Sequence, residues 1–93
     1  MHIARSYSGV PIRLPSERWQ HISQNHPEMA GFLYDVVATV EAPDEVRAGN
    51  NEARFAMREI EAGKALVVVD KETSTDDGFV ITAFLTRQRI LWP

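Results

Sequence analysis

The chain of 93 residues contains no cysteine, so disulfide bonds, thiolate zinc sites and a cysteine nucleophile are excluded. It also lacks a long apolar stretch. The longest uninterrupted run, Ala65 to Val69, is far short of the roughly 20 residues that a membrane-spanning helix needs. The first residues show no apolar segment typical of a secretory signal peptide. These absences predict a cytoplasmic protein that does not enter a membrane and is held together by packing alone.

Basic charge is scarce as well. Ten Lys and Arg residues stand against thirteen Asp and Glu residues, which gives a net charge of −3 with histidine neutral. This balance weighs against a non-specific nucleic-acid-binding protein, because such proteins are usually basic. The charge is uneven, however, since residues 1–27 hold three arginines, one glutamate and all three histidines. A local basic face can therefore exist within an acidic chain.

Length and composition predict a single domain over residues 1–93, because 44% hydrophobic and 25% charged residues are typical of a globular protein. We expect residues 1–10 to form a loose N-terminal arm. A short edge strand is expected over Pro11–Leu14, with its proline at the first position. Ser16 is a good N-cap, so a first helix is expected over Glu17–Asn25.

Apolar residues at helical spacing predict a second helix over Glu28–Val40, and Pro27 is well suited to its first position. From residue 45 onward the pattern favours strands joined by turns, with a polar loop before the last long strand. We expect an α+β domain in which two N-terminal helices pack on a four- to five-stranded antiparallel sheet. The expected strands are Glu45–Ala48, Ala53–Ile60, Ala65–Val69, Phe79–Thr86 and Arg89–Trp92, and the expected polar loop is Lys71–Gly78.

Alternation along the strands suggests a polar face on the sheet. If Phe55 and Met57 pack on the helices, Arg54 and Arg58 line the opposite, open face. In the last long strand, Val80, Thr82, Phe84 and Thr86 would share that open face, and Phe79, Ile81, Ala83 and Leu85 would be covered. Guanidinium groups, hydroxyls and an aromatic ring together suit a phosphodiester and a stacked base.

The first helix carries two of the three histidines. Trp19 and Ile22 should face the core, which turns His26 toward the core rim and His21 toward solvent. A zinc site from these two histidines is disfavoured, because their spacing separates them by about 140° around a helix. His26 could also be a simple helix terminator before Pro27, and His21 a solvated helix residue.

The segment Arg18-Trp19-x-His21-Ile22-x-x-x-His26-Pro27-Glu28-Met29 resembles the signature of small phage- and toxin-associated nuclease-like domains. These domains belong to the barnase–EndoU–colicin–RelE-like group of metal-independent ribonucleases. Ala42-Pro43-Asp44-Glu45-Val46, Leu66–Val69, Phe79–Phe84 and Leu91-Trp92 are similar to later elements of the family. The resemblance covers about residues 11–92.

The resemblance implies RNA cleavage by attack of a ribose 2′-OH on the adjacent phosphate, without a metal or cofactor. It implies that His26 is a general acid or base, that Thr82 contacts phosphate and that Arg54 stabilises the developing charge. His21 is a further candidate for catalysis. The candidates for substrate binding are Arg58, Arg18, Phe84 and Thr86.

The residues leave three functions open. The implied one is an endoribonuclease of the toxin type, acting in the cytoplasm of its own or a target cell, with RNA and a cognate antitoxin or immunity protein as partners. The second is a non-catalytic module that binds RNA, a nucleotide or a protein in the same cleft, and the third is a structural protein of a phage or mobile element. Arg54 and Arg58 also fit an ordinary solvated sheet face. The two signature histidines favour the enzyme, whereas the acidic charge and Phe84 favour the binding module.

Overall fold

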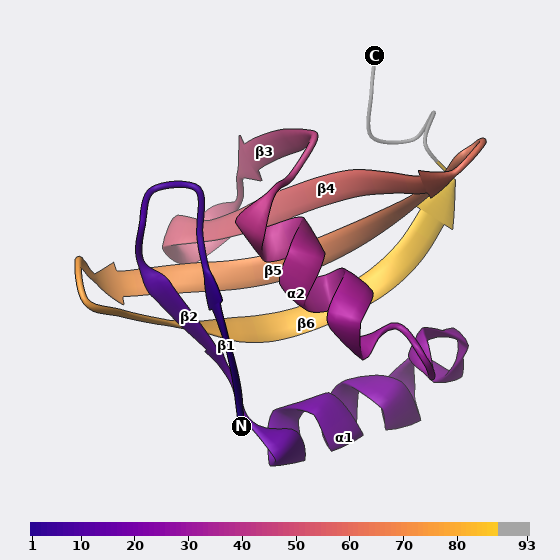
Figure 1. Cartoon of the computed structure of the whole chain (residues 1–93), viewed down its shortest axis with the longest axis horizontal. Helices are drawn as coiled ribbons and strands as arrows, with labels where there is room; N and C mark the ends of the chain where they lie inside the picture. The colour runs from indigo at the N-terminus through magenta and orange to yellow at the C-terminus, as the bar shows by residue number, and fades with distance from the viewer. Residues whose placement is uncertain (88–93) are drawn as a thin grey trace.

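The computed structural model describes residues 1–87, and it has α+β architecture with a six-stranded sheet (Figure 1). The strand expected over Arg89–Trp92 lies outside the described residues. The sheet order is β1-β2-β6-β5-β4-β3. The strands are β1 (His2–Arg5), β2 (Pro11–Leu14), β3 (Glu45–Ala48), β4 (Ala53–Glu61), β5 (Lys64–Ser74) and β6 (Asp77–Arg87). The helices are α1 (Ser16–Asn25) and α2 (Leu33–Glu41), with 3-10 turns η1 (Pro27–Met29) and η2 (Asn50–Glu52). Neither α-helix within residues 1–87 has the length and apolar character to cross a membrane.

The N-terminal segment corrects two expectations. Residues 1–10 are not a loose arm, because β1 pairs antiparallel with β2 and buries Ala4 in the core. The turn between the two strands is closed by the Ser6 N–H donating to the Val10 carbonyl at 2.8 Å, and Gly9 supplies a φ of +87°. Pro11–Leu14 is therefore not an edge strand. It lies between β1 and β6, and it pairs with β6 in parallel. The sheet is thus mixed rather than antiparallel, and it has more strands than expected.

Element lengths differ from the predictions at two further places. The second helix begins at Leu33 rather than Glu28, because Pro27 starts a 3-10 turn and Gly31 adopts a φ of +88° that interrupts the helix. The polar stretch Lys71–Gly78 is mostly paired rather than a loop, since β5 extends to Ser74 and β6 begins at Asp77. Charged side chains are compatible with this hairpin because it projects beyond the covered part of the sheet, as Figure 1 shows.

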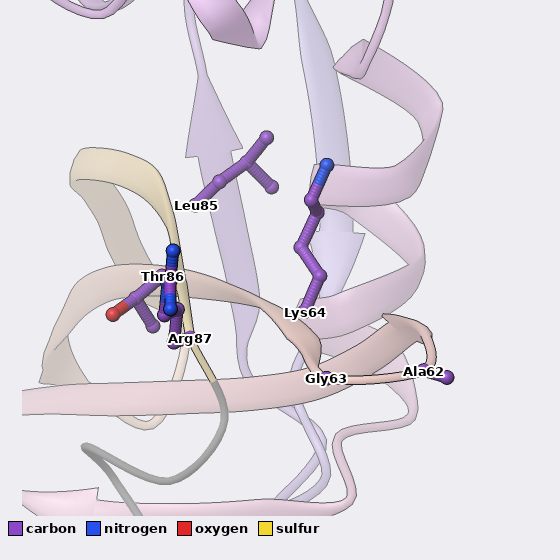
Figure 2. Close-up of a pocket in the computed structure, with 6 residues that line it drawn as sticks. All are labelled: Ala62, Gly63, Lys64, Leu85, Thr86 and Arg87. Atoms are coloured by element: carbon purple, nitrogen blue, oxygen red, sulfur yellow. The ribbon is translucent and has the colours of Figure 1, made fainter.

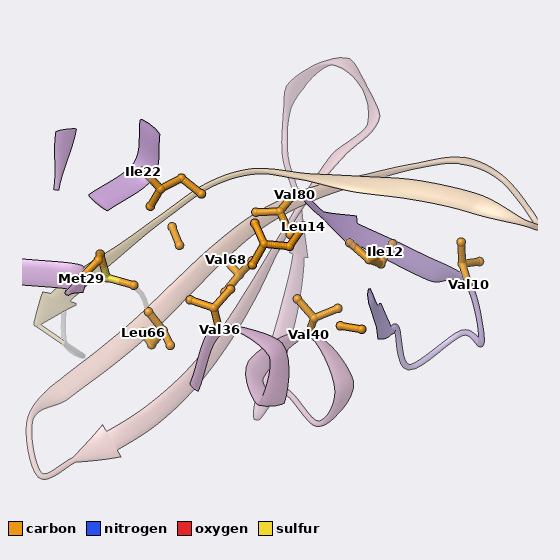
Figure 3. Packing of buried hydrophobic residues seen from close by; sticks show 12 residues of the cluster. Val10, Ile12, Leu14, Ile22, Met29, Val36, Val40, Leu66, Val68 and Val80 are labelled. Carbon is orange, nitrogen blue, oxygen red and sulfur yellow. The ribbon is translucent and has the colours of Figure 1, made fainter. Parts of the chain in front are cut away.

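The main core lies between the helices and one face of the sheet (Figure 3). Ile22 of α1, Met29 of η1 and Val36 of α2 pack against Leu66 and Val68 of β5, and all five are at most 1% exposed. Burial of each large side chain contributes about 1.5 to 3 kcal/mol relative to exposure. This packing fixes α1 and η1 along the sheet.

A second apolar cluster occupies the opposite face of the sheet. Met57, Val67 and Val69 form it, with Phe55, Ile81 and Phe84 packed around them. Phe55 and Met57 therefore do not pack on the helices, which corrects the predicted orientation of β4 and places Arg54 and Arg58 on the helix-covered face. The sequence could not decide this, because β5 is apolar on both of its faces.

A β-bulge explains why the faces of β6 differ from a simple alternation. The register shifts between Val69 and Asp70, which pair with Thr82 and Val80, so Ile81 is the extra residue. Val80, Ala83 and Leu85 consequently belong to the helix-covered core, whereas Ile81 and Phe84 belong to the second cluster. Simple alternation predicts Val80 on the open face and Ile81 on the covered face, and both predictions are wrong.

Candidate functional site at the seam between α1 and β6

The outer edge of β6 changes its neighbour partway along the strand. Among the described residues, β2 pairs with β6 at Gly78 and Phe79 and no further. Beyond that point α1 and η1 lie along the edge of β6 (Figure 1). Arg18 of α1 bridges this seam, because its Nη1 donates to the Ile81 carbonyl at 3.4 Å. The bulged residue therefore presents its carbonyl to a helix arginine rather than to a strand.

His26 and Phe84 meet at the far end of this seam. Their ring centroids are 6.2 Å apart with an interplanar angle of 37°. His26 is the C-cap of α1, where its backbone N–H donates to the Ile22 carbonyl at 2.8 Å. Pro27 ends the helix at this point and holds His26 outside the α region, as the sequence predicts. The His26 side chain is 37% exposed, so its ring is both anchored against Phe84 and open to solvent.

The carboxylate of Glu28 lies beside the imidazole of His26. Its Oε2 lies 3.6 Å from Nδ1 of His26, one residue beyond Pro27. A carboxylate near Nδ1 favours a proton on that nitrogen and leaves Nε2 as the proton acceptor. The ring is thus set up as a base.

Asn25 contacts the other ring nitrogen, Nε2, in the case of His21. The Asn25 Nδ2 amide donates to Nε2 of His21 at 2.9 Å, one helical turn apart. Because Nε2 accepts this bond, the neutral ring carries its proton on Nδ1 and acts there as a donor. Glu17, Arg18 and His21 line a shallow hollow of about 330 Å³ on the same helix. One histidine of α1 is therefore arranged as an acceptor and the other as a donor.

Thr82 and Thr86 lie on the same face of β6 as Phe84. Thr82 is directly opposite Val69 of the second cluster, and Thr86 is opposite Ala65. Both threonines are partly exposed. Their hydroxyls therefore extend the surface around Phe84, in agreement with the face predicted for them.

Arg54 is placed elsewhere and is already paired. Its Nη2 lies 3.0 Å from Asp70 Oδ1 and its Nη1 lies 2.9 Å from Glu72 Oε2. The guanidinium also lies under Tyr7, 5.3 Å from the ring centroid. Asp70 is opposite Val80 on the helix-covered face, so this cluster is separate from Phe84, which lies on the other face.

The pKa values of the two carboxyl groups around Arg54 are shifted in opposite directions. Burial raises the pKa of Asp70 above its usual range, and the Arg54 guanidinium opposes this only in part. Burial would also raise the pKa of Glu72, but hydrogen bonds from Ser8 and Ser6 together with Arg54 lower it overall. This arrangement is a packed ion-pair network that joins the N-terminal hairpin to β4 and β5.

Arg58 does not join His26 either. It pairs in register with Leu66, whose side chain is in the helix-covered core, so Arg58 is on that face as well. Of the residues predicted for the site, the structure places Arg18, His26 and Phe84 at the seam, with Thr82 and Thr86 beside Phe84. His21 lies next to Arg18 on the exposed side of α1, and Arg54 and Arg58 are separate from all of these.

Sequence reasoning missed the two residues that orient the histidines. Glu28 was visible in the His-Pro-Glu-Met signature, and Asn25 lies one turn after His21, the spacing at which helix side chains meet. The sequence spacing of Glu28 from His26 and of Asn25 from His21 could therefore have predicted both contacts. In residues 1–87, no three or more His, Asp or Glu side chains come together in a group that could hold a metal ion.

Comparisons of the chain with models of protein families, with curated proteins and with solved structures found no match.

Proposed function

We propose that the seam between α1 and β6 is the active site of a metal-independent endoribonuclease. The observation that carries the proposal is the placement of His26 against Phe84, with its Nδ1 facing Glu28 and its ring partly open. An imidazole beside an aromatic ring suits a nucleotide whose base stacks while its ribose 2′-OH is deprotonated. The resemblance of this segment to toxin-associated nuclease domains supports the same function.

The reaction proposed here is an internal transfer at phosphorus. His26 Nε2 takes the proton of the ribose 2′-OH, and the 2′-oxygen attacks the adjacent phosphate. The bond between phosphorus and the 5′-oxygen breaks, and water supplies the proton to that leaving oxygen. The products are a 2′,3′-cyclic phosphate and a free 5′-hydroxyl, so no metal or redox partner is needed.

Arg18 takes the part that the sequence assigned to Arg54. Its guanidinium already lies at the seam, where it makes a long hydrogen bond of 3.4 Å to the Ile81 carbonyl. A phosphate oxygen offers a stronger, charge-assisted acceptor than this carbonyl. Thr82 and Thr86 are the hydroxyl contacts on the side of Phe84.

The biological role that fits this activity is a toxin acting on cytoplasmic RNA in its own or a target cell, restrained by a cognate antitoxin or immunity protein. The net charge of −3 gives the protein little general attraction to RNA or to an acidic inhibitor. Both partners would therefore have to bind mainly through contacts at the seam itself.

One observation favours a second candidate, a module that binds RNA, a nucleotide or a protein without cleaving it. Arg54 is 17% exposed and occupied by two carboxylates, so the cation implied for the transition state is not free to act. If Arg18 does not replace it, binding at Phe84 remains but the rate enhancement is lost.

The deciding experiment is cleavage of single-stranded RNA in EDTA by the wild-type protein, by His26→Ala and by Arg18→Gln. We expect fragments that end in 2′,3′-cyclic phosphate from the wild type, a loss of about 100-fold or more with His26→Ala, and a smaller loss with Arg18→Gln. His2→Ala is the matched control, because His2 lies on β1 against Tyr34. Intact RNA with measurable oligonucleotide binding would replace the enzyme by the binding module.

A further inference from the structure

Two cationic residues occupy paired positions at the end of the sheet where β4 turns into β5. Lys64, the first residue of β5, pairs directly with Arg87 of β6. Like charges directly opposite each other on a sheet are destabilising. Figure 2 shows Lys64 extending from the turn, and it shows Thr86 and Arg87, the last two described residues of β6. An anion bound between the two residues would reduce this repulsion.

The same residues line a hollow. Ala62, Gly63 and Lys64 form one wall, and Leu85, Thr86 and Arg87 form the other, around a volume of about 320 Å³ (Figure 2). Gly63 adopts a φ of +77° and leaves the turn without a side chain, so its backbone is accessible from this side. The hollow therefore combines two positive charges with an open backbone turn.

The acid beside the hollow is weakly held. Glu61 Oε1 lies 2.9 Å from Lys64 Nζ, with 64% of the Glu61 side chain and 47% of the Lys64 side chain exposed. An exposed ion pair of this kind contributes only about 0 to 1 kcal/mol, so a dianion can displace Glu61 from Lys64 at little cost. Arg58 adds positive charge nearby, because it pairs with Leu66 on the same face, two residues from Lys64.

We infer that the hollow between the β4–β5 turn and the end of β6 is a phosphate-binding site, with Lys64 and Arg87 as its cations and the open backbone of Gly63 beside them. It is distinct from the seam, because Arg87 follows Leu85 on the helix-covered side whereas Phe84 lies on the other. The inference rests on the proposed function only for the source of the phosphate, which would be a second phosphate of the RNA strand bound at the seam. A small phosphorylated ligand has the same chemistry.

The test uses a fluorescein-labelled single-stranded DNA octamer, which has no 2′-OH and is not cut by the proposed reaction. Its affinity is measured by anisotropy over a range of salt concentrations for the wild type and for Lys64→Gln/Arg87→Gln. We expect the slope of log K against log salt to fall in magnitude by about 1.4, or about 0.7 for each lost phosphate contact. Arg5→Gln/Arg47→Gln is the control, since it changes the net charge equally at the exposed outer strands β1 and β3.

An equal fall in both double variants overturns the site, and so does an unchanged slope in both variants when inorganic phosphate produces no saturable shift either. In parallel, inorganic phosphate is titrated while the amide signals of Gly63 and Thr86 are followed by NMR. Saturable shifts that Lys64→Gln/Arg87→Gln abolishes, without any change in the DNA slope, assign the site to a small phosphorylated ligand instead of the strand. Failure of the endoribonuclease is a separate outcome, because it shows as intact RNA while Lys64→Gln/Arg87→Gln still lowers the slope for DNA as expected.

Discussion

The guanidinium of Arg54 lies 3.0 Å from the carboxylate of Asp70, whose side chain is only 1% exposed. This pair explains why a residue predicted for catalysis is held inside the structure. Asp70 is a buried charge that needs a partner, and Arg54 is directly opposite it in the ladder between β4 and β5. The contact between Arg54 and Asp70 is therefore structural.

Removal of Arg54 should destabilise the fold. Arg54→Ala leaves Asp70 buried without its cation, and we expect a loss of about 3 to 5 kcal/mol in the free energy of unfolding at pH 8. The loss should be smaller at pH 5. Burial already raises the pKa of Asp70, removing Arg54 raises it further, and a protonated Asp70 no longer needs a cation. Urea unfolding at the two pH values measures both effects.

A double variant separates the ion pair from simple truncation. Arg54→Met with Asp70→Asn removes both charges, so we expect it to be more stable than Arg54→Ala alone. A loss with Arg54→Ala that is the same at pH 5 and pH 8 would contradict the role given to Asp70. The result also matters for activity assays, because an inactive Arg54→Ala protein must first be shown to be folded.

Phe84 should contribute to substrate binding through its ring. Phe84→Leu keeps an apolar side chain in the second cluster but removes the stacking surface, which is worth about 1 to 3 kcal/mol for each base. We expect KM for RNA to rise about tenfold with a smaller change in kcat. Phe55→Leu is the matched control, because Phe55 belongs to the same cluster but comes from β4. Equal effects of the two substitutions would show that the cluster, and not stacking, is being measured.

Much of the site on α1 was predictable, because its signals are local. His26-Pro27 predicts the end of the helix, and helical spacing predicts His26 at the rim of the core. The structure ends α1 at Asn25 and leaves the His26 side chain 37% exposed. The orientation of the sheet was not predictable from alternation. Leu66 and Val67 are both fully buried on opposite faces, so the pattern of β5 contains no information about which side the helices cover.

The N-terminal hairpin shows a second limit. Met1 to Gly9 has few apolar residues and reads as an arm, yet β1 is stabilised by contacts that are distant in sequence. Ser6 and Ser8 donate to Glu72 at 2.8 and 2.6 Å, across more than sixty residues. Only the folded structure brings these groups together, so the parallel pairing of β2 with β6 could not be deduced from local spacing either.

Glu72 should make the stability of the protein sensitive to acid. Its pKa is lowered below the ordinary value of 4.5, so it stabilises the folded state above that pH and this contribution is lost as the pH falls through the lowered pKa. We expect Glu72→Gln to lose about 1 kcal/mol at pH 7, and the difference from wild type to shrink toward pH 3. Thermal unfolding across this range measures it. Glu59→Gln, at an exposed position of β4, should show no such convergence.

Gly78 pairs with Ile12 where β2 lies beside β6. It therefore lies next to the point beyond which the edge of β6, within residues 1–87, is no longer paired with β2 and lies beside α1. A Cβ at this position would lie 2.6 Å from Ile12 Cδ1 and 2.7 Å from the Lys71 carbonyl oxygen. The Lys71 carbonyl belongs to the backbone and cannot turn away, so we expect Gly78→Ala to lower the free energy of unfolding by about 1 to 3 kcal/mol.

Ile12→Val in the same chain removes Cδ1 and one of these two contacts. We therefore expect the double variant to lose less stability than the sum of the two single substitutions, without recovering fully, because the contact with the Lys71 carbonyl remains. Urea unfolding of the four proteins in this cycle measures the coupling. Strict additivity would mean that Ile12 already moves aside in Gly78→Ala. In that case the backbone of β5 alone requires glycine here, and the position of β6 beside α1 is set by β5 rather than by β2.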